Sequence, residues 1–99
     1  MAEYLLSPEA LDNLQSILEF IALDSPTGAE QMLDELFAAF EKLAEWPRQG
    51  HTRPDLTDRK VRFWPVASYL VVYRGDRTPL QIVAVLHGAR DVPTVMRDR

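Results

Sequence analysis

Apolar positions follow two different periods along the chain, and the change of period divides it into a helical and a strand-forming part. Between residues 8 and 46, apolar side chains recur every three or four residues, which is the period of an amphipathic helix. Beyond residue 59 the period becomes two, which is typical of strands. A short, mostly apolar segment, Glu3–Leu6, precedes the helical part and predicts an opening strand.

Ser-Pro pairs at residues 7–8 and 25–26 indicate where two helices begin, because serine caps a helix and proline fits its first position. The pattern predicts a first helix over about residues 8–23 and a second from residue 26 to near Trp46. Pro47 ends the second helix, since the residue before a proline disfavours the helical conformation. The short connection between them predicts an antiparallel helical hairpin.

The second half of the chain predicts a loop over residues 47–59 and then three strands in tight succession. We place these strands at Lys60–Val66, Tyr69–Arg74 and Leu80–His87, and a short terminal helix or extended tail at about residues 91–99. The order β-α-α-β-β-β predicts one α+β domain over residues 1–99, with the helical hairpin on one face of an antiparallel sheet.

Both faces of the predicted sheet are substantially apolar. In Leu80–His87, for example, each set of alternate residues contains several aliphatic side chains. A sheet with one solvated face alternates apolar and polar residues instead. We therefore expect the second face to need a cover, supplied by a protein partner. The C-terminal tail or a second copy of the chain is the alternative cover.

Composition bounds the class of protein. A chain of 99 residues is long enough for one domain with a modest core. The absence of cysteine excludes a disulfide scaffold and suits a reducing cytoplasm. No apolar run approaches the roughly 18 residues of a membrane span, and the N-terminus does not resemble a signal peptide. We expect a cytoplasmic domain without a membrane partner.

The two parts of the chain that differ in hydrophobic period also differ in net charge. Residues 1–46 carry ten acids and one base, for a net charge of −9, whereas residues 47–99 carry ten bases and five acids, for +5. Such asymmetry indicates one face for solvent and another for an anionic partner, although a solvated acidic helix surface gives the same pattern. The total of −4 argues against a generic nucleic-acid binder.

Few groups offer catalytic or metal-binding chemistry. His51 and His87 alone do not make a zinc site, and no serine has a histidine and an acid arranged around it in sequence. The glycines lack phosphate-binding spacing. We therefore expect neither a metal nor a cofactor. In the turn after Arg74, Gly75 is expected to supply a positive φ.

At the level of ordered motifs, the chain resembles the ParE/RelE superfamily of bacterial type II toxins. The matching features, spread over nearly the whole chain, are Tyr4, Ser7-Pro8-x-Ala10, Pro47-x-x-Gly50, Asp55-Leu56, Val61-Arg62, Tyr69–Arg74 and Ile82–Asp91. The resemblance implies a toxin held inactive by a cognate antitoxin that wraps it. It also leaves a homodimer or a toxin–antitoxin heterotetramer as possible assemblies.

The superfamily contains two activities. ParE-like members bind and poison DNA gyrase without a catalytic group of their own. RelE-like members cut messenger RNA on the ribosome, and here the candidate nuclease set is Arg62, His87 and Arg90. A guanidinium can clamp a phosphate and an imidazole can transfer a proton. Each also has a structural interpretation: ion pairing with a helix carboxylate for Arg62, a strand-end hydrogen bond for His87, and a local turn for Arg90.

We favour the ParE-like activity over the nuclease. The chain is acidic, whereas an approach to ribosomal RNA requires phosphate neutralisation, and glycine follows His87 where several nuclease members place a functional side chain. A non-toxic module that keeps only the antitoxin interface is a further alternative. The candidates for binding the target or the antitoxin are Arg62, Trp64, Tyr73, His87 and Arg90. Of the two tryptophans, Trp64 shares its parity with Arg62 and is the better candidate anchor.

Overall fold

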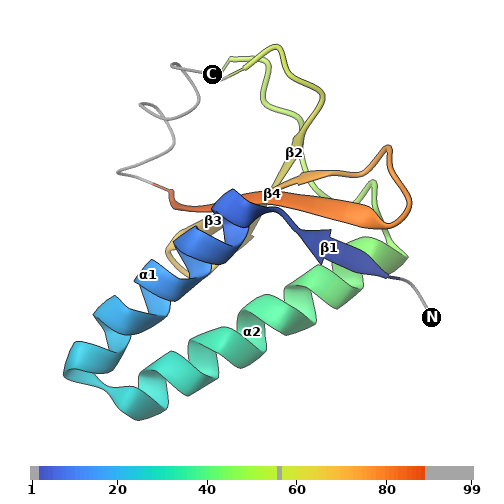
Figure 1. The fold of residues 1–99 in the computed structure, drawn as a ribbon. Coiled ribbons are helices and arrows are strands. Elements are labelled where there is room, and N and C mark those ends of the chain that lie inside the picture. Colours follow the sequence, from blue (N-terminus) through green and yellow to red (C-terminus); the bar gives the residue numbers. More distant parts are fainter. Residues whose placement is uncertain (1–2, 56, 89–99) are drawn as a thin grey trace.

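The computed structural model describes residues 3–55 and 57–88, in which two helices pack against a four-stranded sheet (Figure 1). The elements are β1 (Tyr4–Leu6), α1 (Pro8–Asp24), α2 (Pro26–Glu45), β2 (Arg62–Val66), β3 (Tyr69–Arg74) and β4 (Leu80–His87). The predicted order and α+β class are therefore confirmed. Arg90 and the predicted terminal helix or tail lie outside the described residues.

A single residue connects the two helices of the hairpin. Ser25 is both the C-cap of α1 and the N-cap of α2: its backbone N–H donates to the Ile21 carbonyl, and its Oγ accepts from the Gly28 N–H at 2.9 Å. Ser7 caps α1 in the same way, accepting from the Ala10 N–H at 3.0 Å. Both serine caps and a short connection were predicted, and the connection consists of Ser25 alone.

The sheet has the order β1-β4-β3-β2. β2, β3 and β4 form the expected antiparallel meander, whereas β1 pairs parallel with β4, so that the sheet is mixed and not wholly antiparallel. The parallel pairing follows from the hairpin, because two helices of similar length carry the chain out and back before the meander begins. Strand pairing over such a separation leaves no local trace in the sequence.

A bulge in β4 changes which residues face the helices. Val72 pairs with Ala84 but Tyr73 pairs with Ile82, so one extra residue lies in β4. After the residues of β4 that pair with β1, α1 covers the same edge of β4. There Ser7 Oγ donates to the Val83 carbonyl at 2.7 Å, and Asn13 Oδ1 accepts from the Val85 N–H at 3.1 Å. The regular alternation of side chains between the two faces of the sheet is therefore interrupted at the centre of β4.

The second face of the sheet is not the open apolar surface that the sequence led us to expect. Phe63, Val72, Ala84 and Leu86 form a second cluster there, and each is at most 4% exposed within this chain alone. The expectation of an uncovered face is therefore wrong. Alternation along strands reports only that both faces are apolar. It does not report whether other segments of the same chain cover the second one.

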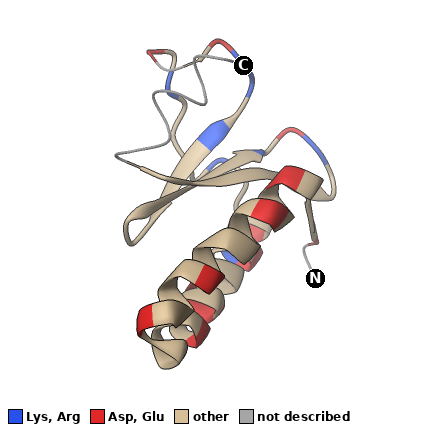
Figure 2. Cartoon of the chain, turned by 60° about the vertical axis from the view of Figure 1, so that its left-hand side comes forward, with Lys and Arg blue, Asp and Glu red and all other residues tan. Residues whose placement is uncertain are grey.

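The charge division of the sequence is also a division in space. Most of the acidic residues lie along α1 and α2, whereas the described basic residues other than Lys42 lie on the strands and the connections around them (Figure 2). No helix in the described part of the chain is long and apolar enough to cross a membrane.

Candidate binding site around Tyr73

Tyr73 organises the segment that follows α2. Its side chain is fully buried, and its hydroxyl donates to the Pro47 carbonyl at 2.8 Å while accepting from the Gly50 N–H at 2.8 Å. Burial raises the pKa of the Tyr73 phenol above its ordinary value, and the Gly50 N–H and the Arg62 charge only partly oppose this. The phenol therefore stays neutral and keeps both hydrogen bonds. We call the set formed by Tyr73, Pro47, Gly50 and Arg62 the Tyr73 node.

Arg62 reaches the same segment from the neighbouring strand. It stands directly opposite Tyr73 in the β2–β3 register, and its Nη1 donates to the Gly50 carbonyl at 2.9 Å. Arg62 and Tyr73 thus bind the two backbone polar groups of Gly50. The guanidinium serves the fold through this bond, and it makes no ion pair with a carboxylate in the described residues.

Two glycines are required by close packing at the node. A Cβ on Gly50 would lie 2.7 Å from Tyr73 Cε1, and a Cβ on Gly75 would lie 2.8 Å from the Pro47 carbonyl oxygen. Neither glycine has a positive φ, so the expected role of Gly75 in the turn is wrong. The spacing Pro47-x-x-Gly50, together with Arg62 and Tyr73, therefore describes one contact network.

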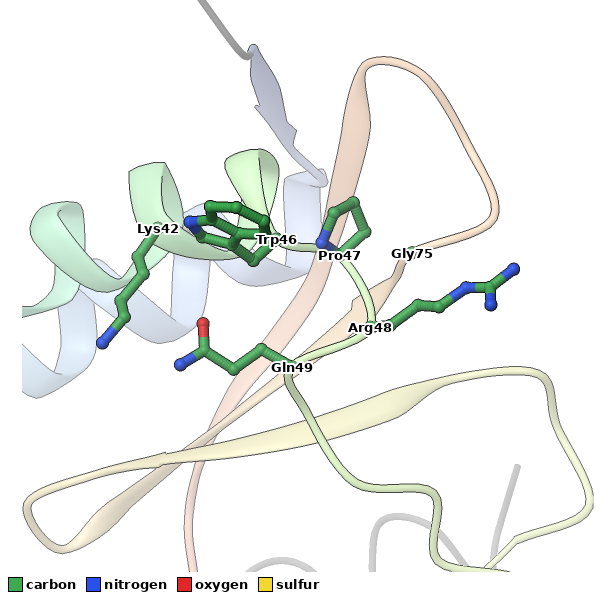
Figure 3. A pocket seen from close by; sticks show the side chains of 6 residues that line it. All are labelled: Lys42, Trp46, Pro47, Arg48, Gln49 and Gly75. Carbon is green, nitrogen blue, oxygen red and sulfur yellow. The ribbon is translucent and has the colours of Figure 1, made fainter.

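An open hollow of about 690 Å³ lies beside the node. It is lined by Lys42, Trp46, Pro47, Arg48, Gln49 and Gly75 (Figure 3). We call it the Trp46 hollow, because the Trp46 indole is 63% exposed. Lys42 also lies over the ring of Trp64, with its Nζ 5.9 Å from the ring centroid. The hollow combines apolar surface with two cations.

Two members of the predicted nuclease set, Arg62 and His87, lie at different ends of the sheet register. Arg62 is opposite Tyr73 in the sheet register, whereas His87 is opposite Tyr69 at the other end of β3. With about 3.3 Å per residue and about 4.8 Å between strands, their Cα atoms are separated by roughly 16 Å. His87 packs its ring edge-on against Tyr69 at 5.8 Å between centroids. Arg90 lies outside the described residues.

The predicted binding residues are also distributed differently from the prediction. Tyr73 is buried and positions a loop, and Trp64 is half-buried against the core between the helices and the sheet. Trp46, which the sequence placed second, is the exposed tryptophan. Its position at the end of α2, just before Pro47, was the available indication that it leaves the helical stripe. The assignment of Arg62, Trp64, His87 and Arg90 to a binding surface stays a prediction.

The Tyr73 node acts as a structural support. Its phenol, guanidinium and backbone groups are bonded to one another, and the described residues contain no group of three or more acidic or histidine side chains that could hold a metal ion. The node holds the chain from residue 47 to residue 50 in place, and the Trp46 hollow is the surface that this segment presents.

Comparison with protein families identifies residues 4–92 as matching the ParE toxin of the type II toxin–antitoxin system parDE. The chain belongs to the ParE toxin family. The matched range includes every helix and strand of the fold and all the residues of the Tyr73 node. ParE membership makes the chain the toxin component of a type II system and implies an antitoxin partner. No curated protein sequence matches the chain significantly.

A solved ParE-type fold supports the same architecture. The structure described as the chromosomal ParDE TA system from P. aeruginosa is 19% identical to this chain and superposes with a TM-score of 0.71. The alignment covers 88% of this chain and 96% of the other. At this identity the likeness establishes the fold, and the α+β arrangement predicted from the sequence is that of the ParE fold.

Proposed function

We propose that this ParE-family toxin acts in the cytoplasm by binding and poisoning DNA gyrase, and that its cognate antitoxin prevents this. Membership of the ParE family carries the proposal. The separation of Arg62 from His87 supports it, because a ribonuclease of the kind considered above would need these groups around one phosphate. Inhibition by binding does not require such an arrangement of catalytic groups.

The decisive experiment is a supercoiling assay with purified gyrase, relaxed plasmid and increasing amounts of the toxin. We expect supercoiling to be lost and cleaved DNA to accumulate, and an equimolar amount of antitoxin to restore activity. The Ser16→Ala variant, altered at an exposed position of α1, is the matched control, and it should inhibit gyrase as the native chain does. Gyrase that works normally at saturating, folded toxin would refute the proposal.

Expression of the toxin without its antitoxin separates the remaining alternatives. A DNA-damage response supports the gyrase mechanism. Translation arrest with codon-linked cuts that vanish in His87→Ala would support a messenger RNA nuclease instead. Unaffected growth would support a non-toxic module. Light scattering of the purified complex would then show whether the assembly is the heterotetramer or a simpler one.

A further inference from the structure

The Trp46 hollow has the properties of a preorganised docking site. Its floor, residues 47–50, is held by Tyr73 and Arg62, so that little ordering is left to be done on binding. Trp46 remains 63% exposed beside this floor. An exposed tryptophan on a rigid support is the kind of residue that dominates binding energy in protein interfaces.

The positive charge around the hollow favours an acidic binding partner. Lys42 and Arg48 lie on opposite sides of it, and none of the described residues that line it is acidic (Figure 3). Lys42 is moreover the one base among the first 46 residues of an acidic chain. Lys42 also complements the negative end of the α2 dipole, but that role does not explain Arg48, which follows the helix.

An unsatisfied acceptor lies in the same place. The Gln49 Oε1 atom is buried and accepts no hydrogen bond from the described residues. Such an atom costs free energy unless a donor reaches it. The Gln49 side chain points into the hollow, toward the side on which Lys42 lies (Figure 3).

We propose that the Trp46 hollow binds an acidic segment of the antitoxin, which inserts one aliphatic or aromatic side chain against Trp46. Lys42 and Arg48 pair with the carboxylates of that segment, and Gln49 accepts one of its backbone N–H groups. A polypeptide fits better than a nucleic acid, because the apolar surface of the hollow favours insertion of a hydrophobic side chain. This inference rests on the antitoxin part of the proposed function and is independent of gyrase.

The test measures the affinity of the full-length toxin for its antitoxin by calorimetry. Trp46→Ala should weaken binding by about 30-fold, the loss expected for a buried anchor. Arg48→Glu should weaken it by about tenfold, with a smaller salt dependence than the native chain shows. Phe20→Ala, which removes an aromatic ring of similar exposure at the distant end of the hairpin, is the control and should change affinity less than about twofold.

Two further measurements locate the contact. In Trp64→Phe, Trp46 is the one remaining tryptophan, and its fluorescence should shift to shorter wavelength when antitoxin binds. A synthetic glutamate-rich peptide with one central leucine should compete with antitoxin, whereas its lysine-rich counterpart should not. Circular dichroism melting of each variant confirms that it is folded, which is expected for an exposed position such as residue 46.

Native affinity in Trp46→Ala would overturn the site while leaving the toxin assignment intact. An equal loss in Phe20→Ala would overturn it as well, because the contact would not be confined to the hollow. If Trp46→Ala abolished self-association of the toxin but not antitoxin binding, the occupant would be a second copy, and the proposal would be wrong. Absence of any antitoxin binding by the native chain would refute the toxin–antitoxin function itself.

Discussion

The tip of the helical hairpin and the C-terminal end of α2 both expose an aromatic side chain, but the chain supports them in different ways. At the hairpin tip, Phe20 and Leu23 are 70% and 87% exposed beside a shallow hollow that Asp24 and Ser25 also line. Roughly 30 Å away along α2, the Trp46 hollow is cationic and rests on the Tyr73 node. The tip is held by bonds between near neighbours, and the hollow by bonds that span up to 26 positions.

This difference indicates where a rigid recognition surface lies. A local turn can change without disturbing the sheet, whereas the segment after α2 cannot move unless Tyr73 and Arg62 release it. We therefore expect substitutions at the node to cost stability and those at the tip to be tolerated. The following experiments test this contrast.

Gly50→Ala should have the largest effect. The new methyl group would meet the Tyr73 ring, with 2.7 Å to Cε1 and 2.9 Å to Cζ, in a fully buried place. We expect the free energy of unfolding to fall by about 3 kcal/mol, measured by urea denaturation. Gly88→Ala is the matched control, because among the described residues its Cβ would meet the Ser68 carbonyl oxygen alone, at an ordinary contact distance of 3.6 Å. Equal stability of the two variants would show that the packing around Tyr73 can adjust to an added methyl group.

Tyr73→Phe should be the next most severe change. It leaves the Gly50 N–H and the Pro47 carbonyl without their partner, at an expected cost of about 2 kcal/mol. Tyr69→Phe, on the same strand, is the control and should cost less than about 0.5 kcal/mol.

Alkaline titration tests the same phenol in the native chain. The folded pKa of Tyr73 is raised, so its contribution to stability is fully present below the ordinary tyrosine pKa near 10.0 and is lost as pH rises through the folded value. Denaturation curves above pH 10 should therefore show a loss of stability that is smaller in Tyr73→Phe. An identical pH dependence in both proteins would contradict the role given to this hydroxyl.

Ser25→Ala tests the local support of the tip. One side chain caps α2, so we expect a loss of about 1 kcal/mol in thermal unfolding. Ser16→Ala, on the exposed side of α1, should have no measurable cost. A loss as large as that of Gly50→Ala would remove the contrast between the two ends.

Phe20→Ala should have the smallest effect. Because its ring is 70% exposed, the free energy of unfolding should change by less than about 0.5 kcal/mol. Improved solubility would be the more visible result, since the substitution reduces the apolar patch at the tip. A marked destabilisation would mean that the tip is packed more firmly than its exposure indicates.

The helices and strands could be predicted because their determinants are local. Ser7 and Ser25 cap helices where the Ser-Pro pairs indicated, and α2 ends at Glu45, next to the predicted Trp46. The alternation of residues also located β3 and β4 at their observed bounds. β2 begins at Arg62, two residues later than predicted, because the edge of an alternating segment does not show where pairing starts.

The site could be predicted only in part, because it depends on contacts between distant segments. Pro47, Gly50 and Arg62 were singled out through a family resemblance, and Tyr73 was named as a binding residue, but no pattern showed that they share one hydrogen-bonded group. The bulge in β4 and the burial of Phe63 likewise depend on pairing and packing across the fold. For the same reason Trp64 was ranked above Trp46, although only the latter is exposed.

The separation of charge between the helices and the strands has a kinetic consequence. Acidic residues along the hairpin and basic residues on the strands and their connections give the described part of the molecule an electric dipole (Figure 2). An approaching partner is turned by this field before contact, so that an anionic surface meets the sheet side first. The association rate of such a partner should therefore fall with ionic strength, while the lifetime of the complex, once formed, responds far less.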